Sequence, residues 1–252
     1  VSQGARIIER YCEIVSGHCD VKNGGKTLGA HASGKSLTVV ASLRISEIFL
    51  SLQGESRTVG LPTVFVRLTG CPLRCVWCDT SHAFTGGVRQ NLDEILQNIA
   101  SYGVPRVCVT GGEPLAQPDV LKLLDRLLSA DYDVSLETSG SMSIADVNPK
   151  VSRVLDLKPP GSGEEKANRY DNIALLTAHD QVKFVIQDEA DYRWAIAKMA
   201  EYQLTDRCEV LFSPVAGERS PVWLAEQIVA DRLNVRFQLQ LHKILWGDKP
   251  GV

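Results

Sequence analysis

Three cysteines within eight residues are the most chemically reactive feature of the sequence. Cys71, Cys75 and Cys78 form a C-x3-C-x2-C pattern directly after residues 63–68, an apolar run that predicts a buried strand. Thiolates are soft ligands that select iron–sulfur clusters, zinc or Cu(I). A structural zinc ion requires four ligands, whereas a cubane cluster held by three thiolates leaves one iron open. The pattern therefore favours an iron–sulfur cluster with one free coordination position.

Other polar turns also follow predicted strands. The turns 110–114 (TGGEP) and 137–140 (ETSG) and the polar loop 158–172 each come directly after a β-like segment. The carboxyl ends of parallel strands meet at one edge of a sheet, where ligands bind. We therefore expect these turns and the cysteine loop to surround one ligand site.

Strand-like and helix-like segments alternate from residue 43 onward. Apolar and β-branched runs predict strands, and apolar residues at helical spacing predict helices. The expected strands are 44–50, 63–68, 106–109, 133–136, 151–157, 181–186, 209–213 and 234–241. The expected helices are one that begins with the near capping box at 91–94, and 118–130, 189–202 and 220–231. Such strand–helix units with short connections predict parallel α/β packing, and residues 246–252 are expected to form a loop.

The composition indicates a soluble globular protein. The 252 residues are 44% hydrophobic and 23% charged, and the net charge of −3 gives no reason to expect a nucleic-acid surface. No apolar run approaches the length of a membrane span, and the N-terminus lacks a secretory pattern. Seven cysteines, three of them clustered, do not resemble a disulfide framework. A reduced, cytoplasmic protein is expected.

Residues 1–42 differ in character from the rest of the chain. We expect them to form a weakly ordered or peripheral extension, through an upstream addition or a misassigned start, before one domain at 43–252. Residues 29–36 match the G-x4-G-K-S phosphate loop, which requires a strand before it and a helix after it. Residues 21–27 contain adjacent glycines and residues 37–41 are strand-like, so we interpret the match as coincidence.

The cysteine pattern and the glycine-rich turn together resemble the radical S-adenosylmethionine (SAM) superfamily. From about residue 43 to the C-terminus, the chain further resembles the 7-carboxy-7-deazaguanine synthase family. The motifs that carry this resemblance are Glu47-Ile48-Phe49, Leu52-Gln53-Gly54-Glu55, Arg67, Cys78-Asp79-Thr80, Glu137-Thr138-Ser139-Gly140 and Gln240-Leu241-His242-Lys243. The resemblance implies an α/β fold, an incomplete TIM-like barrel of parallel strands with helices outside.

The resemblance also implies an activity. Members of the family convert 6-carboxy-5,6,7,8-tetrahydropterin into 7-carboxy-7-deazaguanine with loss of ammonia, on the route to queuosine and other 7-deazapurines. They use a [4Fe-4S] cluster, S-adenosylmethionine and Mg2+. The resemblance further implies a homodimer and an electron donor such as flavodoxin or ferredoxin. The expected protein is a radical carbon–nitrogen lyase that acts on a small pterin, without a nucleic-acid or membrane partner.

Roles for individual residues follow from the same resemblance. The expected metal ligands are Cys71, Cys75 and Cys78 for the cluster and Thr80 for Mg2+, a hard cation that keeps several waters. The expected cofactor contacts are Trp77, Cys78, Asp79, Gly112, Asp156, Leu157 and Lys158. The expected substrate contacts are Leu52, Gln53, Gly54, Arg67 and Thr110, and Glu55, Glu137 and His242 are expected to bind the pterin or handle protons. Arg67 suits a carboxylate because a planar guanidinium can donate two parallel hydrogen bonds.

Two features depart from the family pattern. Where some members have Ser-Pro-Lys at a strand end, this chain has Asp156-Leu157-Lys158, so the lysine alone is matched outright. Members whose terminal carboxylate approaches the site end sooner than residues 246–252 of this chain. The role of that carboxylate is therefore not transferred.

Two alternative functions remain at the level of sequence. A glycyl-radical activating enzyme shares the cysteine spacing, but its protein substrate gives less need for Gln53, Glu55 and Arg67. A non-catalytic zinc-binding module could use His82 as a fourth ligand. Zinc would leave the glycine-rich turn unexplained.

Overall fold

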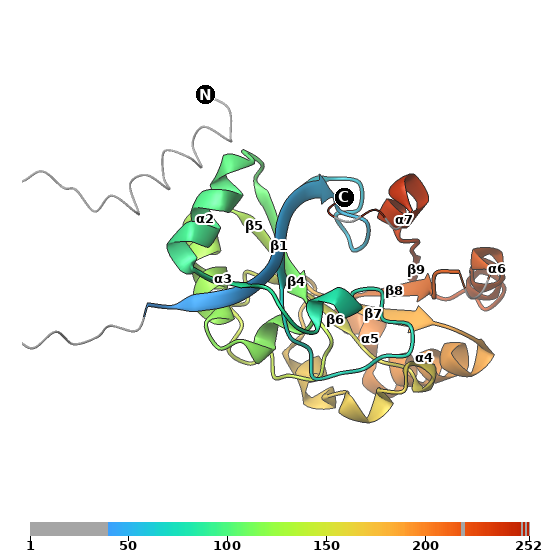
Figure 1. Cartoon of the computed structure of the whole chain (residues 1–252). Coiled ribbons are helices and arrows are strands. Elements are labelled where there is room, and N and C mark those ends of the chain that lie inside the picture. Colours follow the sequence, from blue (N-terminus) through green and yellow to red (C-terminus); the bar gives the residue numbers. More distant parts are fainter. Residues whose placement is uncertain (1–39, 218–219, 248, 250, 252) are drawn as a thin grey trace, which may run out of the picture.

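The computed structural model describes residues 40–217, 220–247, 249 and 251. The extension expected at 1–42 lies almost entirely outside the described residues, as does the phosphate-loop match at 29–36. The described part consists of one curved sheet with helices packed around it (Figure 1).

The sheet has nine strands within the described residues, in the order β3-β1-β2-β4-β5-β6-β7-β8-β9. The strands are β1 Ser42–Leu52, β2 Pro62–Leu68, β3 Val88–Asn91, β4 Arg106–Gly111, β5 Asp133–Thr138, β6 Ser152–Asp156, β7 Gln181–Ile186, β8 Glu209–Pro214 and β9 Arg236–Phe237. All pairs from β2 to β9 are parallel, whereas β1 pairs antiparallel with β2 and β3. The expected incomplete barrel is confirmed, with an antiparallel edge that the sequence did not predict.

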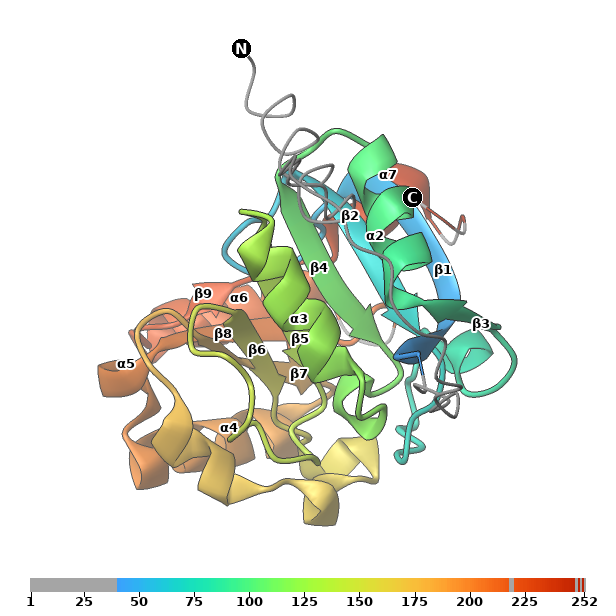
Figure 2. The ribbon, with the colours of Figure 1, turned by 90° about the vertical axis from the view of Figure 1, so that its left-hand side faces the viewer.

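The longer helices cover the outer face of this sheet, as α2 and α3 do on either side of β4 in Figure 2. The helices are α2 Leu92–Ser101, α3 Val120–Ser129, α4 Glu189–Tyr202, α5 Leu204–Arg207, α6 Pro221–Ala230 and α7 Leu241–Trp246. Short 3-10 turns occupy 81–83, 114–116, 160–162, 165–167 and 170–175. Apolar side chains from helices and strands form one buried core between the two layers.

Helix α2 shows how local sequence fixes an element. The Asn91 side chain accepts a hydrogen bond from Glu94 N at 2.9 Å, and Glu94 Oε2 accepts one from Asn91 N at 2.9 Å. This reciprocal pair satisfies amide donors that a helix start otherwise leaves unpaired. Ile95, Leu96 and Ile99 then lie buried on the face that meets the sheet, as their spacing predicts.

The turn between β1 and β2 ties one side of the sheet to strands near the other. Arg57 N donates to Gln181 Oε1 at 2.7 Å, at the start of β7. Ser56 N donates to Gln238 Oε1 at 2.8 Å, and Gln238 Nε2 returns a bond to Ser56 O at 2.9 Å. The turn therefore spans the open side of the barrel, and its first residues, 53–55, lie inside the barrel.

The strand expected at 234–241 is wrong over most of its length. Only Arg236–Phe237 pair with β8, and α7 begins at Leu241. Gln238 is buried against the β1–β2 turn instead of continuing a ladder. This long-range contact overrides the local pattern, which does not encode it.

Candidate active site

A cavity of about 950 Å³ lies against the inner face of the sheet. Its walls come from the cysteine loop (residues 71–80), the turn at 110–112, strands β5 to β8, and residues 240–243. The turns after parallel strands meet there as expected, whereas residues 53–55 arrive through the β1–β2 turn because β1 runs antiparallel. A cavity of this size can hold a cofactor together with a small substrate.

The glycine-rich turn lies directly on the start of the cysteine loop. Glu113 N donates to Gly70 O at 2.8 Å, and Gly112 N donates to Leu68 O at 3.1 Å. A Cβ atom on Gly112 would lie 2.1 Å from Gly70 O, so a side chain has no room there. Glycine is required because two backbones approach each other at the edge of the cavity.

Glu113 fixes the same turn to the end of β5. Its fully buried carboxylate accepts hydrogen bonds from Ser139 N at 2.8 Å, Thr138 Oγ1 at 2.9 Å and Leu115 N at 3.0 Å, and from the Ser139 hydroxyl. These donors compensate the cost of burying a charge. Glu113 thus sets the relative position of two turns that line the cavity.

The three thiols of the cysteine loop line the cavity and form no disulfide. Burial raises the pKa of the Cys71 and Cys75 thiols, and the Lys158 ammonium acts on both in the opposite direction. Metals bind the thiolate form. Lys158 therefore favours the form that a cluster requires.

The zinc alternative needs four ligands around one ion, whereas a cubane held by three thiolates leaves one iron open. His82, the fourth ligand of the zinc alternative, instead lies 3.6 Å from Glu47 Oε1 through its Nε2.

Glu137, Thr110 and Gln53 form a hydrogen-bonded group on the cavity wall. Thr110 Oγ1 donates to Glu137 Oε2 at 2.8 Å, and Gln53 Nε2 donates to Glu137 Oε1 at 3.4 Å. Each carboxylate oxygen can accept more than one hydrogen bond, so Glu137 retains acceptor capacity. This carboxylate is suited to a ligand that presents adjacent N–H groups.

Arg67 and two phenylalanines form another part of the wall. Arg67 Nε lies 2.7 Å from Glu47 Oε1, which engages one of the five N–H donors of the guanidinium. The Arg67 guanidinium carbon is 5.8 Å from the Phe49 ring centroid, and Phe49 stacks on Phe65 with centroids 5.2 Å apart. The wall thus combines flat apolar surface with a fixed cation, as a planar anionic ligand requires.

Thr80 and Asp79 provide oxygen atoms at the far end of the cysteine loop. Thr80 Oγ1 donates to Asp79 Oδ1 at 2.8 Å, and Gln240 Nε2 donates to Asp79 Oδ2 at 3.1 Å. Burial acts to raise the pKa of Asp79, but the hydrogen bonds from Thr80 and Gln240 outweigh it and hold the pKa below its usual range. Hydroxyl and carboxylate oxygens are ligands that suit Mg2+.

Two lysines and an aspartate form the charged wall beside Cys75. Lys158 Nζ lies 3.0 Å from Asp156 Oδ2, and Lys183 Nζ lies 3.5 Å from the same oxygen. Asp156 Oδ1 and Ser213 Oγ are buried without a hydrogen-bond partner among the described residues, and both residues line the cavity. Buried polar atoms are normally paired, so these two are available to a bound cofactor.

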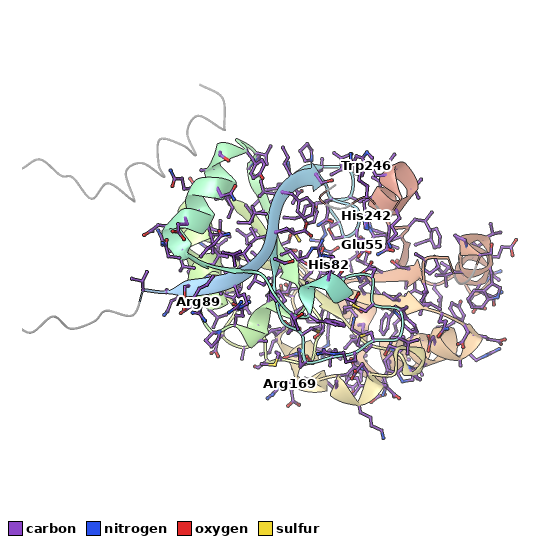
Figure 3. The ribbon with its side chains drawn as sticks, in the orientation of Figure 1. Glu55, His82, Arg89, Arg169, His242 and Trp246 are labelled. Atoms are coloured by element: carbon purple, nitrogen blue, oxygen red, sulfur yellow. The ribbon has the colours of Figure 1, made fainter. Side chains whose placement is uncertain are left out.

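The remaining predicted residues line the cavity, with the exception of Leu157. Leu52, Gly54, Trp77 and His242 all line the cavity. The His242 ring packs on Gly54, where a Cβ would lie 2.2 Å from Nδ1, and Figure 3 shows His242 near Glu55. Leu157 does not line the cavity, because its side chain is fully buried in the hydrophobic core. A cofactor contact through the Leu157 side chain is therefore not supported.

Comparison with known proteins identifies the family. Residues 65–208 match the Radical SAM superfamily. A 7-carboxy-7-deazaguanine synthase of Chlorobaculum tepidum is 41% identical over 220 residues, which cover 86% of this chain and 100% of that protein. A second, of Koribacter versatilis, is 41% identical over 221 residues, which cover 81% of this chain and 97% of that protein. The chain belongs to the 7-carboxy-7-deazaguanine synthase family.

A solved structure agrees with the fold of this family. The crystal structure of QueE from Escherichia coli matches with a TM-score of 0.65 at 24% identity, and the match covers 80% of this chain and 95% of that one. The radical SAM superfamily uses a [4Fe-4S] cluster and S-adenosylmethionine, and the 7-carboxy-7-deazaguanine synthase family also uses Mg2+. The thiols, the orphaned polar atoms and the Thr80 oxygen fit these three groups. No described helix is long and apolar enough to cross a membrane.

Sequence reasoning gave no site role to Glu47, Glu113, Lys183 or Gln240. Glu47, Lys183 and Gln240 contact predicted site residues, and Glu113 accepts from Ser139 in the turn at 137–140. Lys183 had one detectable signal, because it is the charged residue within the otherwise apolar stretch of β7. The signal of Gln240 was misread as part of a strand. Glu113 belongs to a recognised motif, but its buried partners come from a different turn.

Proposed function

We propose that the protein is a 7-carboxy-7-deazaguanine synthase that converts 6-carboxy-5,6,7,8-tetrahydropterin into 7-carboxy-7-deazaguanine with release of ammonia. One observation carries this proposal. In a chain of this family, three free thiols and the Glu137–Thr110–Gln53 group line the same cavity. The three thiols suit a radical cofactor, and the Glu137–Thr110–Gln53 group suits the N–H donor edge of a pterin.

The cofactor end of the cavity has a defined set of residues. Cys71, Cys75 and Cys78 would hold the cluster, and Thr80 would offer its oxygen to Mg2+. When bound, the cluster and S-adenosylmethionine would supply a 5′-deoxyadenosyl radical to take a hydrogen atom from C6 of the pterin. The overall loss of ammonia is redox-neutral, so that hydrogen atom would have to be returned. The unpaired oxygens of Asp156 and Ser213 would accept or donate hydrogen bonds to the cofactor.

The substrate end would bind the pterin by its two polar ends. The amino-amide edge of a pterin presents adjacent N–H donors, and the two oxygens of Glu137 can accept from both. Thr110 and Gln53 hold that carboxylate in place. Arg67 would pair with the substrate carboxylate, because Glu47 leaves other N–H donors of its guanidinium for a ligand.

Loss of ammonia requires a proton on the departing nitrogen. Glu55 and His242 are the candidates, because both line the cavity next to the β1–β2 turn. Either side chain could pass that proton to the nitrogen.

We also propose that the protein works as a cytoplasmic homodimer that receives electrons from flavodoxin or ferredoxin. The family resemblance supports these assignments. Reduction of a SAM-bound cluster requires a low-potential donor, and these carriers meet that requirement.

The deciding experiment is an anaerobic assay. Protein reconstituted with iron and sulfide is incubated with the carboxytetrahydropterin, S-adenosylmethionine, Mg2+ and dithionite, and products are separated and identified by mass. We expect 7-carboxy-7-deazaguanine and ammonia in equal amounts. The ring contraction with loss of ammonia is redox-neutral, so S-adenosylmethionine should not be consumed in proportion to the product. An intact cluster that yields no carboxydeazaguanine would refute the proposed substrate.

The ligand assignment has a separate test. Cys75→Ala should lose the brown colour and near-visible absorbance of the reconstituted protein, because thiolate-bound iron produces both. Cys208→Ala is the matched control, because Cys208 is buried and lies outside the cavity. A Cys75→Ala protein with the iron and sulfide content of the wild type would contradict the assignment.

A further inference from the structure

Lys183 is a buried cation that joins two parts of the cavity. It occupies the third position of β7, between buried Val182 and Phe184, and its side chain is 13% exposed. Its Nζ lies 2.6 Å from Glu55 Oε2 and 3.5 Å from Asp156 Oδ2. One ammonium therefore contacts carboxylates from the β1–β2 turn and from the end of β6.

Burying an ammonium is unfavourable unless carboxylates and hydrogen bonds compensate for the water that it loses. Burial acts to lower the pKa of Lys183, but Glu55 and Asp156 outweigh it and raise the pKa well above its usual value. The side chain is therefore a permanent cation and does not serve as a proton donor at neutral pH.

The two carboxylates that Lys183 contacts belong to different ligand subsites. The backbone N of Glu55 donates to Gln53 Oε1 at 3.2 Å, and Gln53 in turn donates to Glu137 at the substrate end. Asp156 also contacts Lys158 Nζ at 3.0 Å, and both charges act on the Cys75 thiol at the cofactor end. Lys183 is thus the shared partner of one residue assigned to the pterin and one assigned to the cofactor.

We propose that Lys183 is a positioning residue that fixes the carboxylates of Glu55 and Asp156 relative to each other, and so aligns the pterin with the adenosyl group. This inference rests on the proposed function. Lys183 acts through its two partners and carries no proton in the reaction. Hydrogen transfer requires the pterin and the adenosyl group in near-attack geometry, and Lys183 would maintain that geometry through Glu55 and Asp156.

The test replaces Lys183 with methionine, which keeps a similar length and removes the charge. The matched control is Lys122→Met on α3, since Lys122 forms an ion pair with Asp119 at 2.8 Å and its side chain is 65% exposed. Two quantities are measured for each protein: 5′-deoxyadenosine formed per carboxydeazaguanine, and binding of the pterin to the unreduced protein by fluorescence quenching. Thermal unfolding of each protein identifies a variant that fails to fold.

If Lys183 aligns the pterin with the adenosyl group, its replacement should change the kinetics and the binding in a specific way. For Lys183→Met we expect about tenfold or greater loss of kcat, since small misplacements of reacting groups can cost about 100-fold, together with more 5′-deoxyadenosine per product. Pterin binding should weaken about tenfold, because Glu55 loses its cationic partner. Lys183→Arg, which keeps the charge, should restore part of the coupling, and Lys122→Met should match the wild type.

A double-mutant cycle shows whether Lys183 acts through Glu55. If it does, the losses of Lys183→Met and Glu55→Gln will be clearly less than additive in the double variant. A folded Lys183→Met protein with the wild-type ratio of 5′-deoxyadenosine to carboxydeazaguanine and wild-type pterin binding would overturn the inference. Fully additive losses in the double variant would overturn it as well. Failure of the proposed function looks different, because wild-type protein would then form no carboxydeazaguanine. In that case the pterin-binding comparison still decides the role of Lys183.

Discussion

At the scale of single residues, the part of the cavity proposed to bind the pterin depends on the Glu137 carboxylate, whose hydrogen-bond partners are neutral. Thr110 and Gln53 orient Glu137 without neutralising it, so its negative charge is available to N–H donors of a ligand. Glu137→Gln replaces one acceptor oxygen with a donor amide, and charge-assisted hydrogen bonds contribute about 1.5–3 kcal/mol each. We expect pterin binding to weaken roughly 10- to 100-fold, with binding of S-adenosylmethionine unchanged. Titration of each ligand measures this, and equal weakening of both would contradict the assignment.

Residues expected to contact ligands had clearer sequence signals than residues that support them. Cys71, Cys75 and Cys78 follow one another in one loop, so their spacing indicated a metal centre, and the family resemblance added Thr80. Glu113 and Lys183 act through partners more than 20 residues away, Ser139 and Glu55, and no local pattern encodes such contacts. Leu157 was predicted from its place beside Asp156 and Lys158, and its side chain lies in the hydrophobic core, outside the cavity.

At the scale of elements, the glycine-rich turn needs its glycine to rest on the cysteine loop. In Gly112→Ala the new Cβ would lie 2.1 Å from Gly70 O, and neither backbone can move without displacing the loop that carries Cys71. We expect a large loss of reconstituted cluster, measured by iron content and visible absorbance. Gly103→Ala is the control, because it introduces a strained residue at φ +66 with no atom within 4 Å and lies far from the cavity. Equal cluster loading in both variants would contradict this account.

A second prediction at this scale concerns α2. Asn91→Ala removes the side chain that accepts from Glu94 N, and loss of such a cap lowers the free energy of unfolding by about 1 kcal/mol. Urea denaturation measures the change, and pterin turnover should be unaffected because Asn91 lies outside the cavity. A stability equal to that of the wild type would show that the cap is dispensable.

Elements with strong local signals were predicted with nearly correct bounds. Strand 181–186 and helix 189–202 match β7 and α4, because alternation, helical spacing and the Asp188 cap all act locally. The short strand β3 and helix α7 were missed, since each exists through packing against distant segments, as in the hydrogen bond from Leu241 N to Gly54 O at 3.0 Å. Antiparallel pairing of β1 also had no local signal, yet it determines how Glu55 reaches the cavity.

At the scale of the whole molecule, the candidate site and a buried ion pair lie at opposite ends of the parallel strands. Most of the predicted ligand residues lie at the carboxyl ends of these strands or in the turns after them, whereas Arg153 and Asp180 form a buried ion pair at the beginnings of β6 and β7. Their side chains are 4% and 0% exposed, and Arg153 Nε donates to Asp180 Oδ1 at 2.9 Å. Thr177 N donates to the other oxygen at 2.8 Å, so the buried charge is well satisfied.

This ion pair predicts how stability depends on pH. Burial acts to raise the pKa of Asp180, but the hydrogen bonds from Arg153 outweigh it and leave the pKa below its usual value. The unfolded carboxyl titrates near pH 3.9, so the stabilisation is complete above about that pH and is lost as the pH falls through the lower folded value. Asp180→Asn should therefore be less stable at neutral pH by about 3–5 kcal/mol, because Arg153 is left buried without its partner. Its free energy of unfolding should also fall less steeply with acid than that of the wild type, as measured by urea denaturation from about pH 7 to about pH 3. Parallel pH curves for the two proteins would show that other carboxylates, and not this pair, set the acid stability of the barrel.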